Sequence, residues 1–340
     1  MKFFADRLLV MNKGSIVEEG STLEIFKKPK SKYSKLLFEA AFNKDNFGKI
    51  SLDALCNHIK LCAEMGRKES DKVNNLIVSE KMYSDIGRLS IMKQNRKKYG
   101  NDLKIVIAGC VAQAEGKEIL SRNRDVDIVV GPQTYHKLPE LLKRNEKLVL
   151  NDFPNESKFD FLPLINKTQS SAFVTIQEGC DKFCSFCVVP YTRGAEFSRT
   201  VNEITFEIEH LILNGVKEVT LLGQNVSSYH GMYKSKENKS KYSLTDLIQH
   251  ISKIEGLQRI RYLTSHPSDI KEDLIKEHGN NPKLMPYLHL PIQSGSNKIL
   301  KKMNRKHTKE SYIELIKKVR IARSDLAISS DFIVGFPGET

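Results

Sequence analysis

From about residue 170 onward, short apolar runs alternate regularly with longer stretches of helical periodicity. The runs that predict strands are 172–176, 217–222, 259–263, 287–291 and 327–334. The stretches that predict helices are 203–213, 244–254, 269–277, 297–303 and 309–323. Short apolar strands separated by amphipathic helices indicate parallel βαβ units. The alternation therefore predicts an α/β fold, with a whole or partial β/α barrel over 171–340.

A polar or glycine-rich loop follows each expected strand. These loops are the cysteine segment 180–187 and the segments 223–225, 264–267, 293–296 and 335–339. In β/α barrels the chemistry sits on the loops at the carboxyl ends of the strands. Each loop alone is also typical of an ordinary turn, because Gly, Pro, Ser and Asn are turn formers. Together the loops predict one shared mouth.

The first of these loops holds half of the six cysteines of the chain. Cys180, Cys184 and Cys187 have the spacing C-x3-C-x2-C. Three thiolates can hold three irons of a 4Fe-4S cluster and leave the fourth iron open to a substrate or cofactor. A structural zinc site normally takes four protein ligands, and no further Cys or His lies within about twenty residues of these three cysteines in the sequence. The spacing favours the open cluster, and a zinc knuckle or a chance grouping is the alternative.

Charge and hydropathy indicate the compartment and the class of partner. The formal net charge is +13 over 340 residues, which favours an anionic macromolecular partner, although a generally Lys-rich composition is the other interpretation. No apolar run reaches the ~18 residues of a membrane span. A charge appears too early for a secretory signal peptide. We therefore expect a cytoplasmic protein whose clustered thiols serve a metal or catalysis rather than disulfides.

The region before residue 151 has a second α/β pattern. The sequence predicts strands at 104–108 and 127–130 and helices near 116–120 and 135–143. Cys110 follows the first strand directly, which is a plausible position for a metal ligand. A single cysteine there is otherwise typical of a small core residue. The polar, Pro-containing stretch 151–170 predicts a linker.

With these residues in view, the chain resembles the radical S-adenosylmethionine (SAM) methylthiotransferases. The resemblance extends over about residues 75–340 and is densest in Gln-Glu-Gly-Cys-Asp-Lys-Phe-Cys-Ser-Phe-Cys-Val-Val-Pro-Tyr-Thr-Arg-Gly at 177–194. Met-Asn-Arg-Lys-His-Thr at 303–308 supports it. It implies a radical-SAM barrel preceded by a smaller α/β domain. It also implies that Cys180, Cys184 and Cys187 ligate the cluster.

The resemblance further implies where SAM binds. Four residues would lie near SAM, namely Gly223, Gln224, Asn225 and Ser265. Three more residues resemble the segment that supports the adenine end of SAM, namely Ile333, Gly335 and Glu339. No catalytic side chain is assigned, because the reactive chemistry belongs to the cofactors.

The family activity implied is methylthiolation of C2 of N6-dimethylallyladenosine beside the tRNA anticodon. Variants of the family act on threonylcarbamoyl-adenosine in tRNA or on a ribosomal-protein aspartate. Reductive cleavage of SAM would give a radical that abstracts hydrogen from the adenine carbon. The implied partners are the tRNA anticodon loop and a reductant such as a flavodoxin or ferredoxin, and the protein is expected to be a monomer without a membrane partner.

The chain departs from the family pattern in its cysteines. Family members carry a second cluster on three cysteines of the N-terminal domain, and only Cys110, in Ala-Gly-Cys-Val-Ala-Gln, matches them. Cys56 and Cys62 lie in a helical-looking context and more closely resemble buried helix residues. The first cluster is therefore expected and the second is left open. The alternative function is a catalytically defective fragment that binds one 4Fe-4S cluster and SAM only; a zinc-dependent RNA-binding module is a third hypothesis.

The two ends of the chain also depart from the family. Residues 1–40 resemble the C-terminal end of an oligopeptide ABC-transporter ATPase, but no Gly-x4-Gly-Lys-Ser/Thr phosphate loop occurs. We expect a barrel truncated at its C-terminus and lacking the family's RNA-binding β-barrel domain. The expected divisions are a transporter-like remnant at 1–40, an uncertain helical segment at 41–74, an incomplete N-terminal domain at 75–150, the linker at 151–170 and the barrel at 171–340.

Overall fold

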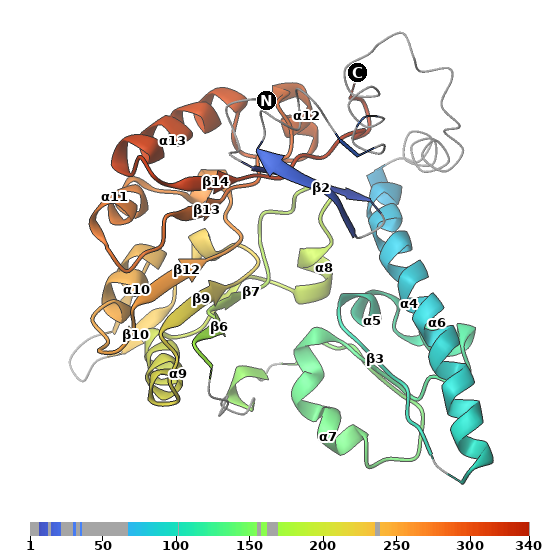
Figure 1. Cartoon of the computed structure of the whole chain (residues 1–340). Helices are drawn as coiled ribbons and strands as arrows, with labels where there is room; N and C mark the ends of the chain where they lie inside the picture. The colour runs from blue at the N-terminus through green and yellow to red at the C-terminus, as the bar shows by residue number, and fades with distance from the viewer. Residues whose placement is uncertain are drawn as a thin grey trace. The chain divides into compact units, whose positions relative to one another are not determined.

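A computed structural model describes residues 7–12, 15–21, 30–31, 35, 67–100, 102–154, 158–161, 169–234 and 239–339 (Figure 1). The chain divides into two compact units. The barrel unit comprises Met1–Glu64, Asn166–Glu178 and Phe197–Thr340, and the cysteine unit comprises Met65–Ile165 and Gly179–Glu196. Each unit is described by itself.

The barrel unit is built on five parallel strands that follow one another in chain order. β6 (Ser171–Thr175), β9 (Glu218–Leu222) and β12 (Arg259–Tyr262) form one parallel sheet with β9 in the middle. β13 (Tyr287–His289) and β14 (Ala327–Ser329) form a parallel pair. A parallel bridge between Ile260 and Leu284 continues the wall from β12 toward β13. This arrangement confirms the predicted α/β fold.

Helices follow the strands and lie along their outer side (Figure 1). They are α9 (Val201–Leu213), α10 (Leu244–Ile251), α11 (Glu272–Asn280), α12 (Asn297–Lys302) and α13 (Lys309–Ala322). Capping boxes at Thr200, Ser243 and Thr308 fix where α9, α10 and α13 begin, because each side chain accepts a hydrogen bond from an otherwise unpaired backbone amide. The inward faces of strands and helices form one fully buried apolar core, which includes Val174 and Ile208.

The last strand is shorter than the sequence predicts. β14 ends at Ser329, whereas the apolar run suggested a strand to residue 334. The Ser330 hydroxyl accepts a hydrogen bond from the backbone amide of Ile292, and the chain then keeps one isolated bridge, between Gln293 and Phe332. The apolar residues beyond Ser329 therefore belong to the loop that follows the strand.

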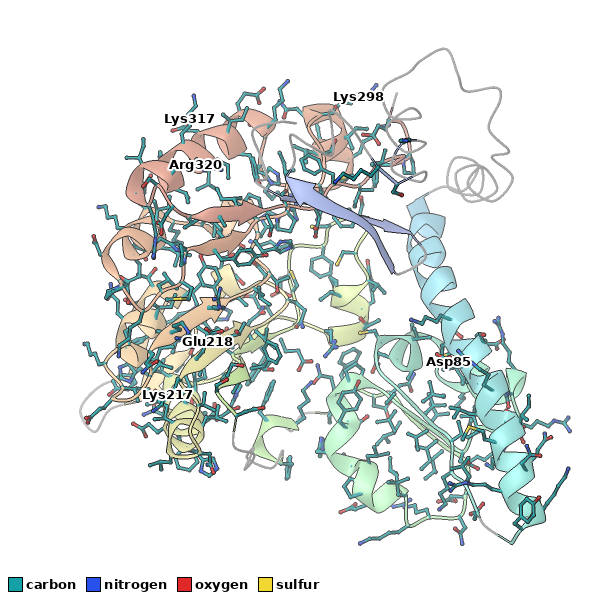
Figure 2. The ribbon with its side chains drawn as sticks, viewed as in Figure 1. Asp85, Lys217, Glu218, Lys298, Lys317 and Arg320 are labelled. Carbon is teal, nitrogen blue, oxygen red and sulfur yellow. The ribbon has the colours of Figure 1, made fainter. Side chains whose placement is uncertain are left out.

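An ion-pair group lies at the amino ends of the barrel strands. The carboxylate of Glu218 accepts hydrogen bonds from Arg259 Nε at 2.6 Å and from Arg261 Nε at 3.1 Å (Figure 2). Partial burial opposes ionisation of Glu218, but the two guanidinium groups outweigh it and lower its pKa. This group holds β9 and β12 together at the end of the barrel opposite the predicted mouth.

The cysteine unit contains a smaller parallel sheet. β3 (Val106–Ala108), β4 (Ile128–Val130) and β5 (Leu148–Leu150) pair in that order. The long helix α4 (Arg67–Lys98) packs against α5 (Cys110–Glu115). The remaining helices of the unit's sheet region are α6 (Lys117–Arg122), η1 (Pro132–Lys137), α7 (Leu138–Leu141) and η2 (Lys158–Asp160).

One local prediction in this unit differs from the structure, and α5 and β5 are not predicted. The helix expected near 116–120 is confirmed as α6, and it is separated from α5 by Gly116, whose φ of 49° is a conformation that other residues rarely adopt. The helix expected near 135–143 is a 3₁₀ segment from Pro132 followed by the short α7, which has Pro139 in its first turn.

Outside these sheets, β1 (Arg7–Asn12) and β2 (Ser15–Ser21) form an antiparallel hairpin. Cys56 and Cys62 lie outside the described residues. α4 passes through the position, between residues 74 and 75, where the sequence placed a domain boundary. The domain division itself stays a prediction. Within the part of the chain that the structure describes, no helix combines the length and the apolar character needed to cross a membrane.

Candidate functional site: a closed cysteine loop and the carboxyl-end loops of the barrel

The cysteine loop is closed at its base by glycine and by backbone hydrogen bonds. The Cys180 amide donates to the Gly194 carbonyl at 3.4 Å, and the Glu196 amide donates to Asp181 Oδ1 at 3.1 Å. Gly179 has a φ of 74°, and a Cβ there would overlap the carbonyl oxygens of Gly194 and Ala195. Only glycine therefore fits where the two ends of the loop meet.

Inside the loop the three thiols influence one another. Cys180, Cys184 and Cys187 are all half-buried thiols, and the Cys187 amide donates to the Cys184 carbonyl at 3.0 Å. Burial, together with the charges of Cys187, Glu196 and Cys184, raises the pKa of Cys180 to about 11, against a backbone hydrogen bond from Lys182 that lowers it. Three thiolates in this loop would repel one another, so a cationic group between them would stabilise the ionised form.

Cys110 belongs to the same unit as these thiols. It is the first residue of α5, and α5 packs against α8 (Val189–Arg193), which begins two residues after Cys187. The Gln133 side chain donates to the Arg193 carbonyl at 2.8 Å and so ties η1 to the end of α8. The structure therefore brings the sheet end that carries Cys110 next to the helix that leaves the cysteine loop.

Among the described residues, no three Cys, His, Asp or Glu side chains are placed to share a single metal ion. A single ion draws all of its ligands to one point, whereas a 4Fe-4S cluster takes one thiolate on each of three irons. The donor set of the loop, three thiols, fits the cluster by its chemistry.

In the barrel unit, a buried glutamine holds the loop after β9. Gln177 lies in β7 (Gln177–Glu178), which pairs with β8 (Phe197–Ser198). Its side-chain oxygen accepts hydrogen bonds from the backbone amides of Gln224 at 3.0 Å and Asn225 at 3.1 Å. A Cβ on Gly223 would lie 2.5 Å from that oxygen. Glycine at this position therefore lets the loop approach the glutamine side chain.

Asn225 joins the loop after β9 to the loop after β12. Its Nδ2 donates to Asp269 Oδ2 at 2.6 Å, and its Oδ1 accepts from the Ser227 hydroxyl at 2.8 Å and the His266 amide at 3.1 Å. The Val226 amide adds a backbone hydrogen bond to the Thr264 carbonyl at 2.8 Å. These contacts account for both polar atoms of the Asn225 side chain, so this residue positions the loops.

The predicted residue Ser265 lies in the second of these two loops. It is 6% exposed, and its hydroxyl has no hydrogen-bond partner within the described residues. A buried hydroxyl without a partner is costly and is expected to face a polar ligand. The preceding Thr264 has a φ of 68°, which is strained for a β-branched residue. Gly223, Gln224, Asn225 and Ser265 are thus brought together by the contacts of Asn225 and Val226.

The other three predicted residues form a separate turn after β14. The Ile333 amide donates to the Gln293 carbonyl at 2.8 Å. Glu339 Oε2 accepts from the amides of Gly335 at 2.7 Å and Phe336 at 3.2 Å, while the Glu339 amide donates back to the Phe336 carbonyl. One carboxylate oxygen of Glu339 therefore closes its own turn. The hydrogen bond from Ile333 to Gln293 holds the turn to the loop after β13.

Sequence reasoning missed Gln177 and Asp269 as parts of this site. Gln177 directly precedes the Glu-Gly-Cys motif, but the hydrogen bond that it accepts comes from a loop 47 residues further along the chain. Asp269 lies in η4 (Pro267–Asp269), which follows β12, and its carboxylate accepts a hydrogen bond from Asn225 in the loop after β9. The Thr-Ser-His-Pro loop at 264–267 predicts a site, but the sequence pattern does not predict which partner each side chain contacts.

Residues 174–340 match the family model of the radical SAM superfamily. Curated tRNA-2-methylthio-N(6)-dimethylallyladenosine synthases from Rickettsia felis and Rickettsia typhi are each 56% identical over 268 residues. The matches cover 77% of this chain and 60% of each relative. The chain therefore spans less than two thirds of the length of these relatives.

Solved structures share the fold at low sequence identity. The radical SAM methyltransferase TsrM from Kitasatospora setae superposes with a TM-score of 0.53 and 13% identity over 75% of this chain and 54% of its own. The cobalamin-dependent radical SAM enzyme OxsB gives a TM-score of 0.50 and 16% identity over 74% and 39%. Residues 174–340 therefore belong to the radical SAM superfamily, and the chain is a relative of the Rickettsia tRNA-2-methylthio-N(6)-dimethylallyladenosine synthases.

Proposed function

We propose that the chain carries a radical-SAM centre that methylthiolates C2 of N6-dimethylallyladenosine beside the tRNA anticodon. The observation that carries the proposal is the closed cysteine loop, in which three half-buried thiols lie within electrostatic reach of one another. The identity to the Rickettsia enzymes, whose names state this product, supports the substrate. The net charge of +13 supports an RNA partner.

Cys180, Cys184 and Cys187 would hold the 4Fe-4S cluster. When bound, such a cluster with an open iron supplies the electron that cleaves the sulfonium bond of SAM. The protein's own contribution is to keep the three thiols in one closed loop. Gly179 allows the two ends of that loop to meet, and the hydrogen bond from Cys180 to Gly194 holds them.

The carboxyl-end loops of the barrel would bind SAM. The unpartnered hydroxyl of Ser265 is the polar group best suited to donate to the ligand. The loop of Gly223 and Gln224 would present backbone groups, with Gln177 fixing its position. Ile333, Gly335 and Glu339 would support the adenine end through the turn that Glu339 closes. Asn225 acts here by holding two loops together rather than by contacting SAM.

We propose that Cys110 is a ligand of a second cluster, because it begins the helix that packs against α8. The alternative is a chain that binds one cluster and SAM and transfers no sulfur. Iron counting on the reconstituted chain and on Cys110→Ala separates them. A loss of about four irons in the variant supports the second cluster, and an unchanged count of about four in both proteins supports the alternative.

The remaining partners are also part of the proposal. A flavodoxin or ferredoxin would supply electrons, the anticodon loop would deliver its adenosine unstacked into the barrel mouth, and the protein would act as a cytoplasmic monomer. A target base on a single-stranded loop costs little to unstack.

Product analysis of the whole chain tests the proposed function. The chain is reconstituted anaerobically with iron and sulfide and given SAM, dithionite and an anticodon stem-loop RNA that contains N6-dimethylallyladenosine. We expect 5′-deoxyadenosine and the 2-methylthio nucleoside by mass spectrometry, and neither from Cys184→Ala. Release of 5′-deoxyadenosine without RNA modification would instead support the single-cluster alternative, and the absence of both products would overturn the proposal.

A further inference from the structure

The short helix α12 presents three exposed lysines on one side. Lys298, Lys301 and Lys302 stand at positions i, i+3 and i+4 of the helix Asn297–Lys302, and Lys298 points outward in Figure 2. Side chains at these spacings are neighbours on a helix, about 5–6 Å apart at Cβ, and like charges there repel one another. We call these three residues the α12 lysine face. Its charge destabilises the isolated helix and so favours binding of an anion.

Two lysines of this face, Lys298 and Lys301, differ from the paired lysine of the next helix in the part of the chain that the structure describes. On α13, Lys318 pairs with Glu272 at 2.6 Å and with Glu314 at 3.6 Å. Within the described part of the chain, neither Lys298 nor Lys301 forms an ion pair. The carboxylate closest in sequence, Glu310, instead accepts from Asn297 at 2.7 Å and lies 3.7 Å from Lys309. Within the residues that the structure describes, the positive charges of Lys298 and Lys301 therefore stay available to a partner.

The lysine face also lies beside the candidate SAM loops. α12 begins directly after the 293–296 loop, at the carboxyl end of β13. The Lys302 ammonium lies so close to Gly338 that a Cβ added to that glycine would overlap the ammonium nitrogen. Gly338 belongs to the same turn as Gly335 and Glu339. A ligand on this face would therefore be next to the turn proposed to support the adenine end of SAM.

We propose that the α12 lysine face contacts the phosphate backbone of the RNA substrate and holds the anticodon loop against the barrel mouth. This inference rests on the proposed function. Exposed lysine ammonium groups are point charges that bind phosphates without reading sequence, and such contacts fix the register of a nucleic acid on a protein. The face would thus orient the loop while the target adenosine enters the mouth.

The test is the binding of a fluorescently labelled anticodon stem-loop RNA, followed by anisotropy as salt rises from about 50 to about 200 mM. The variant is Lys298→Glu with Lys301→Glu, and Lys302 is kept because it contacts Gly338. The matched control is Lys217→Glu with Lys253→Glu, which makes the same change of charge with exposed lysines of the same unit. Lys217 precedes β9, and Figure 2 shows it on the opposite side of the unit from Lys298.

We expect the α12 variant to weaken RNA binding by about tenfold or more and to lower the salt slope by about 1.5, since two phosphate contacts are lost. The control should bind within about twofold of the unchanged chain. Equal weakening in both variants, or no weakening in the α12 variant, would overturn the assignment of this face. Failure of the unchanged chain to bind the RNA would overturn the proposed tRNA substrate, and the α12 contact with it.

Discussion

The side-chain oxygen of Gln177 lies 3.0 Å from the backbone nitrogen of Gln224 and accepts a hydrogen bond from it. The same oxygen accepts from Asn225, so one buried side chain fixes the loop after β9 to the strand that leads into the cysteine loop. The loop after β9 is thereby held by a residue that stands three positions before Cys180 in the chain.

Replacing Gln177 by Ala should weaken both stability and SAM binding. The change leaves the buried amide of Asn225 and the amide of Gln224 without their acceptor, which costs about 1–3 kcal/mol. The Kd for SAM, measured by calorimetry on the reconstituted chain, should rise while the iron content stays unchanged. Gln258→Ala is the matched control, because Gln258 is exposed. Equal SAM affinity in both variants would show that Gln177 does not position the SAM loop.

Replacing Gly179 by Ala should reduce the iron that the chain retains. The new methyl group would overlap the carbonyls of Gly194 and Ala195 and open the base of the cysteine loop. Gly100→Ala is a close control, since Gly100 has the same φ of 74° in the same unit but no atom within 4 Å of the added Cβ. Iron per polypeptide should fall only in Gly179→Ala. A similar loss in both variants would assign the effect to backbone strain rather than to the overlap.

Asn225 and Asp269 should be strongly coupled in a double-mutant cycle. Their 2.6 Å hydrogen bond is part of a largely buried network and has a charged acceptor, for which about 1.5–3 kcal/mol is expected. The cycle Asn225→Ala, Asp269→Ala and both is measured by urea unfolding. The exposed pair Asn297 and Glu310, at 2.7 Å, has the same chemistry and should show a coupling of about 1 kcal/mol or less. Equal coupling in the two pairs would contradict the role given to the buried network.

Acid should destabilise the barrel through two buried histidines. Burial lowers the pKa of His278 to about 4, with Arg323 adding to it, and burial likewise lowers the pKa of His307 to about 4, with Arg305 adding to it. Each ring is neutral when folded and binds a proton near pH 6.5 when unfolded. The unfolded state therefore binds more protons below that pH, and stability is lost as the pH falls from about 6.5 toward about 4.

The expected loss is about 1 kcal/mol for each histidine between about pH 7 and about pH 5.5. Urea unfolding at the two pH values should show it, and the variant His307→Gln should lose about 1 kcal/mol less than the unchanged chain. A variant with the same acid sensitivity as the unchanged chain would contradict a neutral, buried His307.

The sequence predicted the barrel because its strands are apolar runs with polar loops at their ends. Boundaries were less predictable: the stretch 327–334 has apolar residues on both sides of a polar Ser-Ser-Asp segment, and the strand ends at Ser329, where Ile292 and Gln293 make the next contacts. The helix near 116–120 is confirmed as α6, whereas the separate helix α5 before Gly116 is not visible in the helical periodicity.

The candidate site was predictable in its residues more than in their roles. The spacing of the three cysteines predicted the cysteine loop, because such a cluster site is formed by residues that lie close together in the sequence. Asn225 was expected beside SAM but uses both of its side-chain polar atoms within the protein. Glu339 likewise closes its own turn. Such roles depend on partners far along the chain or on backbone geometry, and local pattern does not encode them.

The central claim, that Cys180, Cys184 and Cys187 hold a 4Fe-4S cluster, is tested most directly by counting metal and sulfide. The unchanged chain and the variant with all three cysteines replaced by Ala are reconstituted anaerobically and analysed for iron, zinc and acid-labile sulfide. The claim predicts that the variant lacks about four irons and about four sulfides present in the unchanged chain. Equal iron in the two proteins, or zinc without sulfide in the unchanged chain, would contradict it.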